Sequence, residues 1–191
     1  MNEPITLIDL IRDGRMDAEL AALAWMLVDG GMPVHVVSDD RPTAATSSGA
    51  LRALARDPAA VTDGPGAAIE EVLRQPIPLR PATGAVLVLD AGGRVIAAHL
   101  HRPPLRDAAG HVRTQGPAVL ATWETKLGRW EHFAWGVTPE LAAASGRRAG
   151  DFELEQQQRR EFLEGLAEAE SSGPAQITAA LAGFGVPRTD H

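Results

Sequence analysis

The residues best suited to chemistry lie in the segment 34–54, which runs from a short apolar stretch through a polar loop into a helical pattern. A strand that leads into a turn and then a helix is the layout of a phosphate-binding loop, in which backbone N–H groups hold the anion. The hydroxyl groups of Thr46, Ser47 and Ser48 lie where we expect this helix to begin. The segment therefore predicts the layout of a nucleotide site.

The predicted loop lacks the residues that bind a triphosphate. When Thr46 is aligned with the lysine of a Walker A motif, Asp40 and Ala45 take the glycine positions, and Ser47 takes the place of the Mg²⁺-binding hydroxyl. Threonine brings no positive charge to the phosphates, and Asp40 adds a negative one. We therefore expect ATP binding to be weak or absent. The degenerate nucleotide-loop positions are Asp40, Arg41, Ala45, Thr46, Ser47 and Ser48.

A pair of histidines is a second candidate site. His99 and His101 are two residues apart in a predicted strand, so their side chains share one face. Imidazole nitrogens bind transition metals, and His111, Asp107 or Glu131 could supply a third ligand. The alternative interpretation is a pair of surface histidines without a metal, and we expect no cofactor.

Two other polar residues have structural interpretations. Asp90 follows the apolar stretch 86–89 as a Walker B aspartate would, but it also begins the sequence Asp-Ala-Gly-Gly. An aspartate at the start of a turn commonly accepts hydrogen bonds from the turn backbone, and we favour that role. His35 lies in the first predicted strand, where we expect a hydrogen-bonded core histidine.

Three tryptophans cluster around a predicted hairpin, at positions 123, 130 and 135. Trp123 and Trp130 can face each other across the two strands, an arrangement that sheets favour. We expect the cluster to belong to the core of a chain with few aromatic residues. The alternative is an exposed binding platform, since tryptophan is enriched at interaction hot spots.

Composition restricts the classes of function. The net charge of −7 argues against nucleic-acid binding, which needs a basic surface, and the absence of cysteine excludes disulfides and thiolate metal sites. The longest apolar run, Leu20–Val28, is far shorter than the about 20 residues of a membrane span. The N-terminal residues do not form a secretory signal. We expect a cytoplasmic protein with no nucleic-acid partner and no membrane insertion.

The pattern of elements predicts an α/β or α+β fold. Asp17 precedes apolar residues at helical spacing, and a strand at 34–37 and a helix at about 47–56 follow. The residues 62–66 are predicted to form a turn cluster and 67–74 a helix. The proline-rich stretch 75–83 is the best candidate for a boundary between two subdomains.

The second half is predicted to form an antiparallel meander of four or five strands, followed by helices. The strands fall at 85–90, 94–101, 119–124 and 129–135, with a short one at 111–114, and the helices at 139–144 and about 152–170. We therefore expect one compact domain, 1–170, and a helical C-terminal tail, 171–191. The domain comprises a P-loop-like part (1–75), the meander (84–136) and helices (138–170).

The segment Asp17–Val28 reads Asp-Ala-Glu-Leu-Ala-Ala-Leu-Ala-Trp-Met-Leu-Val, and a strand follows at Met32–Ser38. This order resembles the nucleotide-binding core of type II/IV secretion and pilus-assembly ATPases, the group that drives tight-adherence pili. The region from Gly93 to Ala134 is similar to the strand pair that closes such ATPases. The resemblance covers about two thirds of the chain, and the acidic and histidine boxes of the motor have no counterpart.

The resemblance and the degenerate loop together imply a non-catalytic relative of these ATPases that acts through protein–protein contact, with a partner protein or with itself. We expect the contact surface on the thinly apolar helix 152–170 and the tail. Its residues are Phe152, Phe162, Leu166, Ile177, Leu181 and Phe184. The alternatives are an enzyme, either an atypical NTPase or a metal-dependent hydrolase using His99 and His101, and a small-ligand-binding regulatory domain that uses the meander and its tryptophans.

Overall fold

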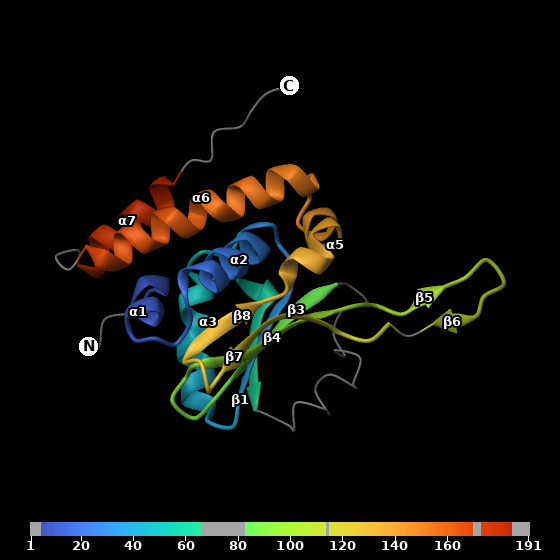
Figure 1. Cartoon of the computed structure of the whole chain (residues 1–191), viewed down its shortest axis with the longest axis horizontal. Helices are drawn as coiled ribbons and strands as arrows, with labels where there is room; N and C mark the ends of the chain where they lie inside the picture. Colours follow the sequence, from blue (N-terminus) through green and yellow to red (C-terminus); the bar gives the residue numbers. More distant parts are fainter. Residues whose placement is uncertain (1–4, 66–82, 114, 170–172, 185–191) are drawn as a thin grey trace.

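A computed structural model describes residues 5–65, 83–113, 115–169 and 173–184 of the chain. Helices pack on one face of a six-stranded mixed sheet of order β2-β1-β3-β4-β7-β8 (Figure 1). The strands are β1 Val34–Ser38, β2 Val61–Pro65, β3 Gly84–Leu89, β4 Val95–His101, β7 Ala118–Glu124 and β8 Arg129–His132. The expected α/β class is confirmed.

The helices form two layers above the sheet (Figure 1). Their bounds are α1 Leu7–Arg12, α2 Ala18–Asp29, α3 Arg41–Arg52, α5 Thr138–Ala144, α6 Ala149–Glu168 and α7 Pro174–Gly183, with short 3₁₀ helices η1 Pro58–Ala60 and η2 Ala134–Val137. A separate hairpin, β5 Leu105–Arg106 with β6 Val112–Arg113, projects from the body. In the described ranges, no helix has both the length and the apolar character needed to cross a membrane.

The sheet joins the two halves of the chain. β1 pairs in parallel with β2 on one side and with β3 on the other, whereas β3, β4, β7 and β8 pair antiparallel in sequence order. The four main strands of the predicted meander are therefore correct, whereas the short strand predicted at 111–114 is β6, which pairs with β5 in the separate hairpin. The predicted subdomain boundary at 75–83, which lies mostly outside the described residues, does not separate two sheets, because β1 and β3 are direct neighbours.

α2 is the central helix. Asp17 caps its N-terminus by accepting a hydrogen bond from the Leu20 N–H, at 2.9 Å. The sequence pattern indicated one buried face, yet nearly every residue from Ala18 to Val28 is buried. The sheet lies on one side of α2, and α6 packs along the other. A helix buried on all sides fits the continuous apolar run that its sequence shows.

β2 replaces the turn cluster predicted at 62–66. The Asp63 carboxylate accepts hydrogen bonds from Ser48 and Arg52 of α3, which hold this strand against the helix. A Cβ at position 64 would lie 3.2 Å from Cε1 of His35, so glycine gives the His35 ring room on the neighbouring strand. Gly64 and Pro65 therefore lie in a strand rather than in a turn. The helix predicted at 67–74 lies outside the described residues.

Two helix starts differ from the prediction. α6 begins at Ala149, before the predicted start at about 152, and Asp151 lies in its first turn. α5 begins at Thr138, before the predicted start at 139, directly after η2, and the Thr138 hydroxyl donates to the Ala134 carbonyl at 3.4 Å. The described part of the predicted tail, α7, folds back so that Ile177 joins the main core.

Candidate functional site

The segment predicted to be a nucleotide-binding loop is a short connection between β1 and α3. β1 ends at Ser38 and α3 begins at Arg41, not at about Ser47, so only Asp39 and Asp40 connect them. The Asp40 carboxylate caps α3 by accepting a hydrogen bond from the Thr43 N–H at 3.0 Å. A carboxylate at a helix N-terminus occupies the place where an anion would bind. The predicted loop is therefore wrong, and the missing signal was the helix start Asp-Arg-Pro.

The other degenerate nucleotide-loop positions lie along α3 instead of around a cavity. Arg41 and Ala45 are exposed on the helix surface. The Thr46 hydroxyl donates to the Pro42 carbonyl at 2.9 Å. Ser47 and Ser48 are buried, and Ser48 donates to the Asp63 carboxylate at 3.0 Å. The hydroxyls of Thr46 and Ser48 thus bond within α3 or to β2, whereas that of Ser47, the residue aligned with the Mg²⁺ ligand, is buried without a hydrogen-bond partner among the described residues.

The histidine candidates are not brought together as a metal site. His99 and His101 share one face of β4, as predicted, and it is the face turned away from the helices. Burial lowers the pKa of both imidazoles, which favours their neutral forms. His111 lies at the β5–β6 hairpin, where its Nδ1 is 3.1 Å from the Asp107 carboxylate. Across the described ranges, no three His, Asp or Glu side chains are grouped to hold a metal ion.

The six residues predicted to form a contact surface lie in the interior. Phe152, Ile177 and Leu181 belong to the buried core, and the others pack against it. The Trp25 ring lies 6.3 Å from the Phe162 ring and 5.2 Å from the Phe184 ring, measured between centroids. Phe152, Ile177 and Leu181 are therefore not exposed as predicted, and the other three positions are half-buried. The remaining members are Phe162, Leu166 and Phe184.

The turn prediction for Asp90 is confirmed, and His35 has the expected hydrogen bond but is half-buried and not part of the core. The Asp90 carboxylate accepts hydrogen bonds from the N–H groups of Gly92 and Arg94, both at 2.9 Å, so it is a turn aspartate. Nδ1 of His35 lies 2.8 Å from the Thr62 hydroxyl on β2. Both residues therefore have structural roles.

The tryptophan cluster separates into a pair and a single residue. Trp123 and Trp130 face each other across β7 and β8, as predicted, with ring centroids 4.5 Å apart. The Trp130 indole N–H donates to the Val95 carbonyl at 2.7 Å. Trp135, by contrast, is 78% exposed. The core interpretation is wrong for Trp135, which follows β8 in the short helix η2.

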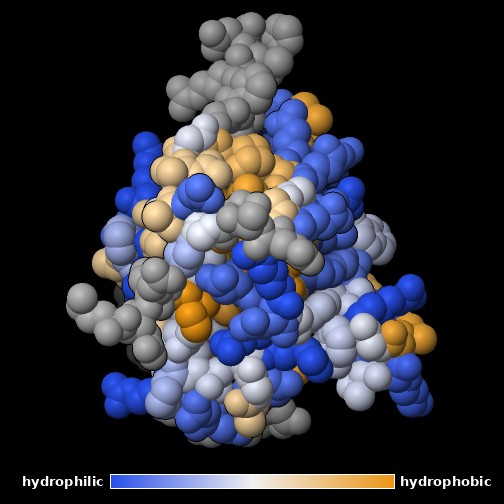
Figure 2. Space-filling view, turned by 90° about the vertical axis from the view of Figure 1, so that its left-hand side faces the viewer, coloured by the Kyte–Doolittle hydropathy of each residue, from blue (hydrophilic) through white to orange (hydrophobic). Residues whose placement is uncertain are grey.

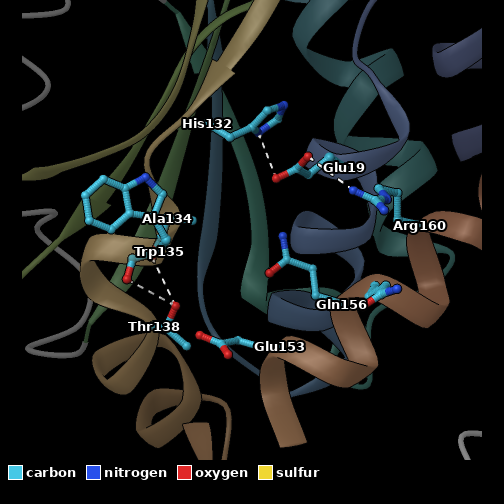
Figure 3. A pocket seen from close by; sticks show the side chains of 9 residues that line it. Glu19, His132, Ala134, Trp135, Thr138, Glu153, Gln156 and Arg160 are labelled. Carbon is cyan, nitrogen blue, oxygen red and sulfur yellow. Dashed lines mark hydrogen bonds and ion pairs between the residues drawn. The ribbon is translucent and has the colours of Figure 1, made fainter. Parts of the chain in front are cut away.

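A polar pocket of about 250 Å³ lies beside Trp135 (Figure 3). Trp135 stands on one side of it, and polar side chains of α6 line the other side. Glu19 of α2 and His132 of β8 close the inner end. The α6 residues recur at helical spacing, so they share one face of that helix. They are Glu153, Gln156, Gln157 and Arg160.

His132 is held between two carboxylates. Its Nε2 donates to the Asp17 carboxylate at 2.8 Å, and its Nδ1 lies 3.9 Å from Glu19. Burial lowers the pKa of His132, but the hydrogen bond and charge of Asp17 and the charge of Glu19 outweigh it, so the pKa is raised. Asp17 therefore caps α2 and orients the imidazole with the same carboxyl group.

The charges of the pocket are unevenly paired. Nη1 of Arg160 lies 3.7 Å from Glu19, and its Nε lies 3.8 Å from Glu164. Glu153 is exposed, and within the described residues it has no ion pair. The pocket therefore presents a carboxylate next to an exposed indole. Sequence reasoning missed this site because its residues come from five separate elements, α2, β8, η2, α5 and α6.

No protein-family model matches the chain, and no curated protein matches it either. The described residues define an α/β protein with a mixed sheet and a polar pocket beside an exposed tryptophan.

Proposed function

We propose that the protein is non-catalytic and acts in the cytoplasm through contact with a protein, and that the Trp135 pocket makes the contact. The 78% exposure of Trp135 carries the proposal. A large amphipathic ring beside a pocket is the usual form of a binding hot spot, because burying it releases water from a wide apolar area. The pocket supplies polar groups around that ring, as the rim of an interface does.

The chemistry of the pocket favours a basic side chain of the partner. The face of an indole attracts a guanidinium or ammonium group, and the Glu153 carboxylate can pair with the same group. The amides of Gln156 and Gln157 can hydrogen-bond the neighbouring backbone. The net charge of −7 also favours encounter with a basic surface.

The same geometry argues against His132 as a catalytic base. A general base needs one ring nitrogen directed at the substrate. Both nitrogens of His132 face carboxylates, those of Asp17 and Glu19. The imidazole therefore serves as a bridge between α2 and β8, and it supports the wall of the pocket.

We also propose that the scaffold derives from a secretion-type ATPase. The order α2, β1, α3 is the order that the resemblance implies, and the Asp40 cap accounts for the loss of nucleotide binding. We expect millimolar Mg²⁺-ATP to leave the melting temperature of the protein unchanged. A rise that requires Mg²⁺ would contradict the non-catalytic assignment.

The contact is tested by placing a photo-reactive amino acid at position 135. We expect one main cross-linked protein in the host cell, identified by mass spectrometry. The control is the same amino acid at Leu127, which is 57% exposed in the β7–β8 turn. A partner that cross-links equally from both positions would argue against a specific contact at the pocket.

Contact between two copies of the chain is distinguished by sedimentation. If the partner is a second copy, the wild type sediments as a dimer at micromolar concentration, and Trp135→Ala shifts it to the monomer. A dimer that persists in Trp135→Ala would place self-association on another surface.

A further inference from the structure

A second cavity, of about 380 Å³, lies beneath α7. Its walls are mainly apolar and come from α1, α2, α3 and α7. They include Leu7, Trp25, Leu54, Leu181 and Phe184. Cavities that bind small molecules are largely apolar with a few polar groups that fix orientation. Here the polar groups are those of Arg159 and Asp29 at one end.

Arg159 is only 4% exposed. Its Nη2 donates to Asp29 at 2.8 Å and lies 2.6 Å from Glu155. Its Nε and Nη1 have no hydrogen-bond partner within the described residues. Buried guanidinium N–H groups without acceptors are unfavourable, so this end of the cavity suits a hydrogen-bond acceptor.

The guanidinium is also fixed in direction. It lies over the Trp25 ring at 4.3 Å and near the Phe184 ring at 5.7 Å, measured to the ring centroids. The Trp25 and Phe184 rings also contact each other, with centroids 5.2 Å apart, so both lie toward the same side of the guanidinium. Contact with the Trp25 face limits the orientation of the group and leaves its edges for hydrogen bonds. The cation is therefore oriented before any ligand arrives.

The surrounding charges favour an anion. Arg159 also borders a polar chamber of about 650 Å³ that adjoins the cavity. The charged side chains of this chamber are Asp29, Arg56, Arg147, Glu155 and Arg159. Three are positive and two are negative, which leaves a net positive charge within an acidic protein.

α7 gives a route into the cavity. In the described part of the chain, the hydrogen bonds of α7 are internal to the helix and its cap, and Ile177, Leu181 and Phe184 attach it to the body by apolar contacts. Figure 2 shows apolar surface in the upper part of the side on which α7 lies in Figure 1. A helix attached in this way can shift without breaking hydrogen bonds to other elements.

We propose that the cavity beneath α7 binds a small amphiphilic anion. The apolar chain of this ligand lies among Trp25, Leu54 and Leu181. Its anionic group accepts hydrogen bonds from Arg159 after Phe184 moves aside. A medium-chain carboxylate has this chemistry. The site is separate from the Trp135 pocket, so it is independent of the proposed protein contact.

Octanoate is the probe for the test, with octan-1-ol as the uncharged analogue and octylammonium as the cation. Calorimetry measures affinity, and the indole N–H signals of the four tryptophans report where the probe binds. We expect octanoate to bind, to shift the Trp25 signal most, and to bind at least about tenfold more tightly than octan-1-ol.

The matched variants are Arg159→Met and Arg148→Gln. Arg148 is exposed at the start of α6, so its replacement changes the net charge equally without touching the cavity. We expect Arg159→Met to weaken octanoate binding at least about tenfold and Arg148→Gln to leave it unchanged. Ala53→Phe, which adds an aromatic ring at an exposed position of the cavity wall and keeps Arg159, is the second variant, and it should abolish binding by blocking the cavity.

Several results would overturn the proposal. They are no octanoate binding at millimolar concentration, equal affinity for octanoate and octan-1-ol, tighter binding of octylammonium, and unchanged binding in Ala53→Phe. If Arg159→Met does not fold, the comparison of probes on the wild type and Ala53→Phe still decides the question. None of these results depends on the protein contact at Trp135.

Discussion

Asp17, Asp40 and Asp90 each accept hydrogen bonds from backbone N–H groups that a helix or a turn leaves without partners. Each lies where a binding or catalytic carboxylate could lie in the sequence. A carboxylate that caps its own helix or turn is already satisfied, so it has less capacity for a ligand. The exception in this respect is Glu153, whose carboxylate is exposed beside Trp135.

Asp40→Ala tests the cap of α3. We expect a loss of about 1 kcal/mol in the free energy of unfolding, because the Thr43 N–H loses its acceptor. Urea denaturation measures it, and Asp39→Ala, also exposed and one residue earlier, is the control. The variant should still not bind Mg²⁺-ATP. If removing this carboxylate created ATP binding, a nucleotide site would lie at the start of α3 after all.

His132→Gln tests the bridge between α2 and β8. Because the pKa of His132 is raised in the folded protein, its protonated form stabilises the fold below the unfolded pKa, about 6.5, and this contribution is lost as pH rises through the folded value. The difference in unfolding free energy between wild type and variant should therefore be largest below about pH 6.5 and shrink as pH rises above it. A difference that grows with pH would contradict the raised pKa. His111→Gln, on the projecting hairpin, is the control.

At the scale of elements, α6 is joined to α2 by a network of four charged side chains. Asp29 pairs with Arg147 and Arg159 at 2.9 and 2.8 Å. Glu155 pairs with the same two arginines at 2.7 and 2.6 Å. Burial raises the pKa of Glu155, but the two arginines outweigh this effect and lower it. The network fixes α6 over α2, and so places Glu153 and Gln156 at the Trp135 pocket.

Glu155→Ala should destabilise the protein by roughly 3 kcal/mol, because two largely buried arginines lose a shared acceptor. Chemical denaturation at neutral pH measures the loss. Glu161→Ala on the same helix is the control, since its only hydrogen bond in the described ranges is to Gln157 at an exposed position. Equal stability of the two variants would show that the network does not hold α6 in place.

At the scale of the whole molecule, short sequence motifs predicted the turns and strands that depend on contacts between residues close together in the chain. The β3–β4 turn follows from Asp90 and from Gly93, whose φ of 83° favours glycine, and the meander was predicted correctly. The α/β class followed from the order of these elements. The start of α3 was missed even though Asp40 and Pro42 formed a readable helix-start signal.

Other parts depend on contacts between distant segments, which one sequence does not specify. β2 forms because His35 fits over Gly64 and Asp63 meets Arg52. The apolar residues of α6 and α7 were expected to bind a partner, whereas Phe162 and Phe184 pack against Trp25, more than a hundred residues earlier. The Trp135 pocket joins α2, β8, η2, α5 and α6, so it has no continuous signature in the sequence.

The most direct test of the proposed contact is the dissociation constant of the complex between this protein and the partner protein that cross-links at position 135. We expect Trp135→Ala and Glu153→Lys each to weaken binding by about thirtyfold or more, as loss of an interface hot spot does. Leu127→Ala should bind like the wild type, and all three variants should keep its melting temperature. If Trp135→Ala and Glu153→Lys bound the partner as tightly as the wild type, the pocket would not be the contact site.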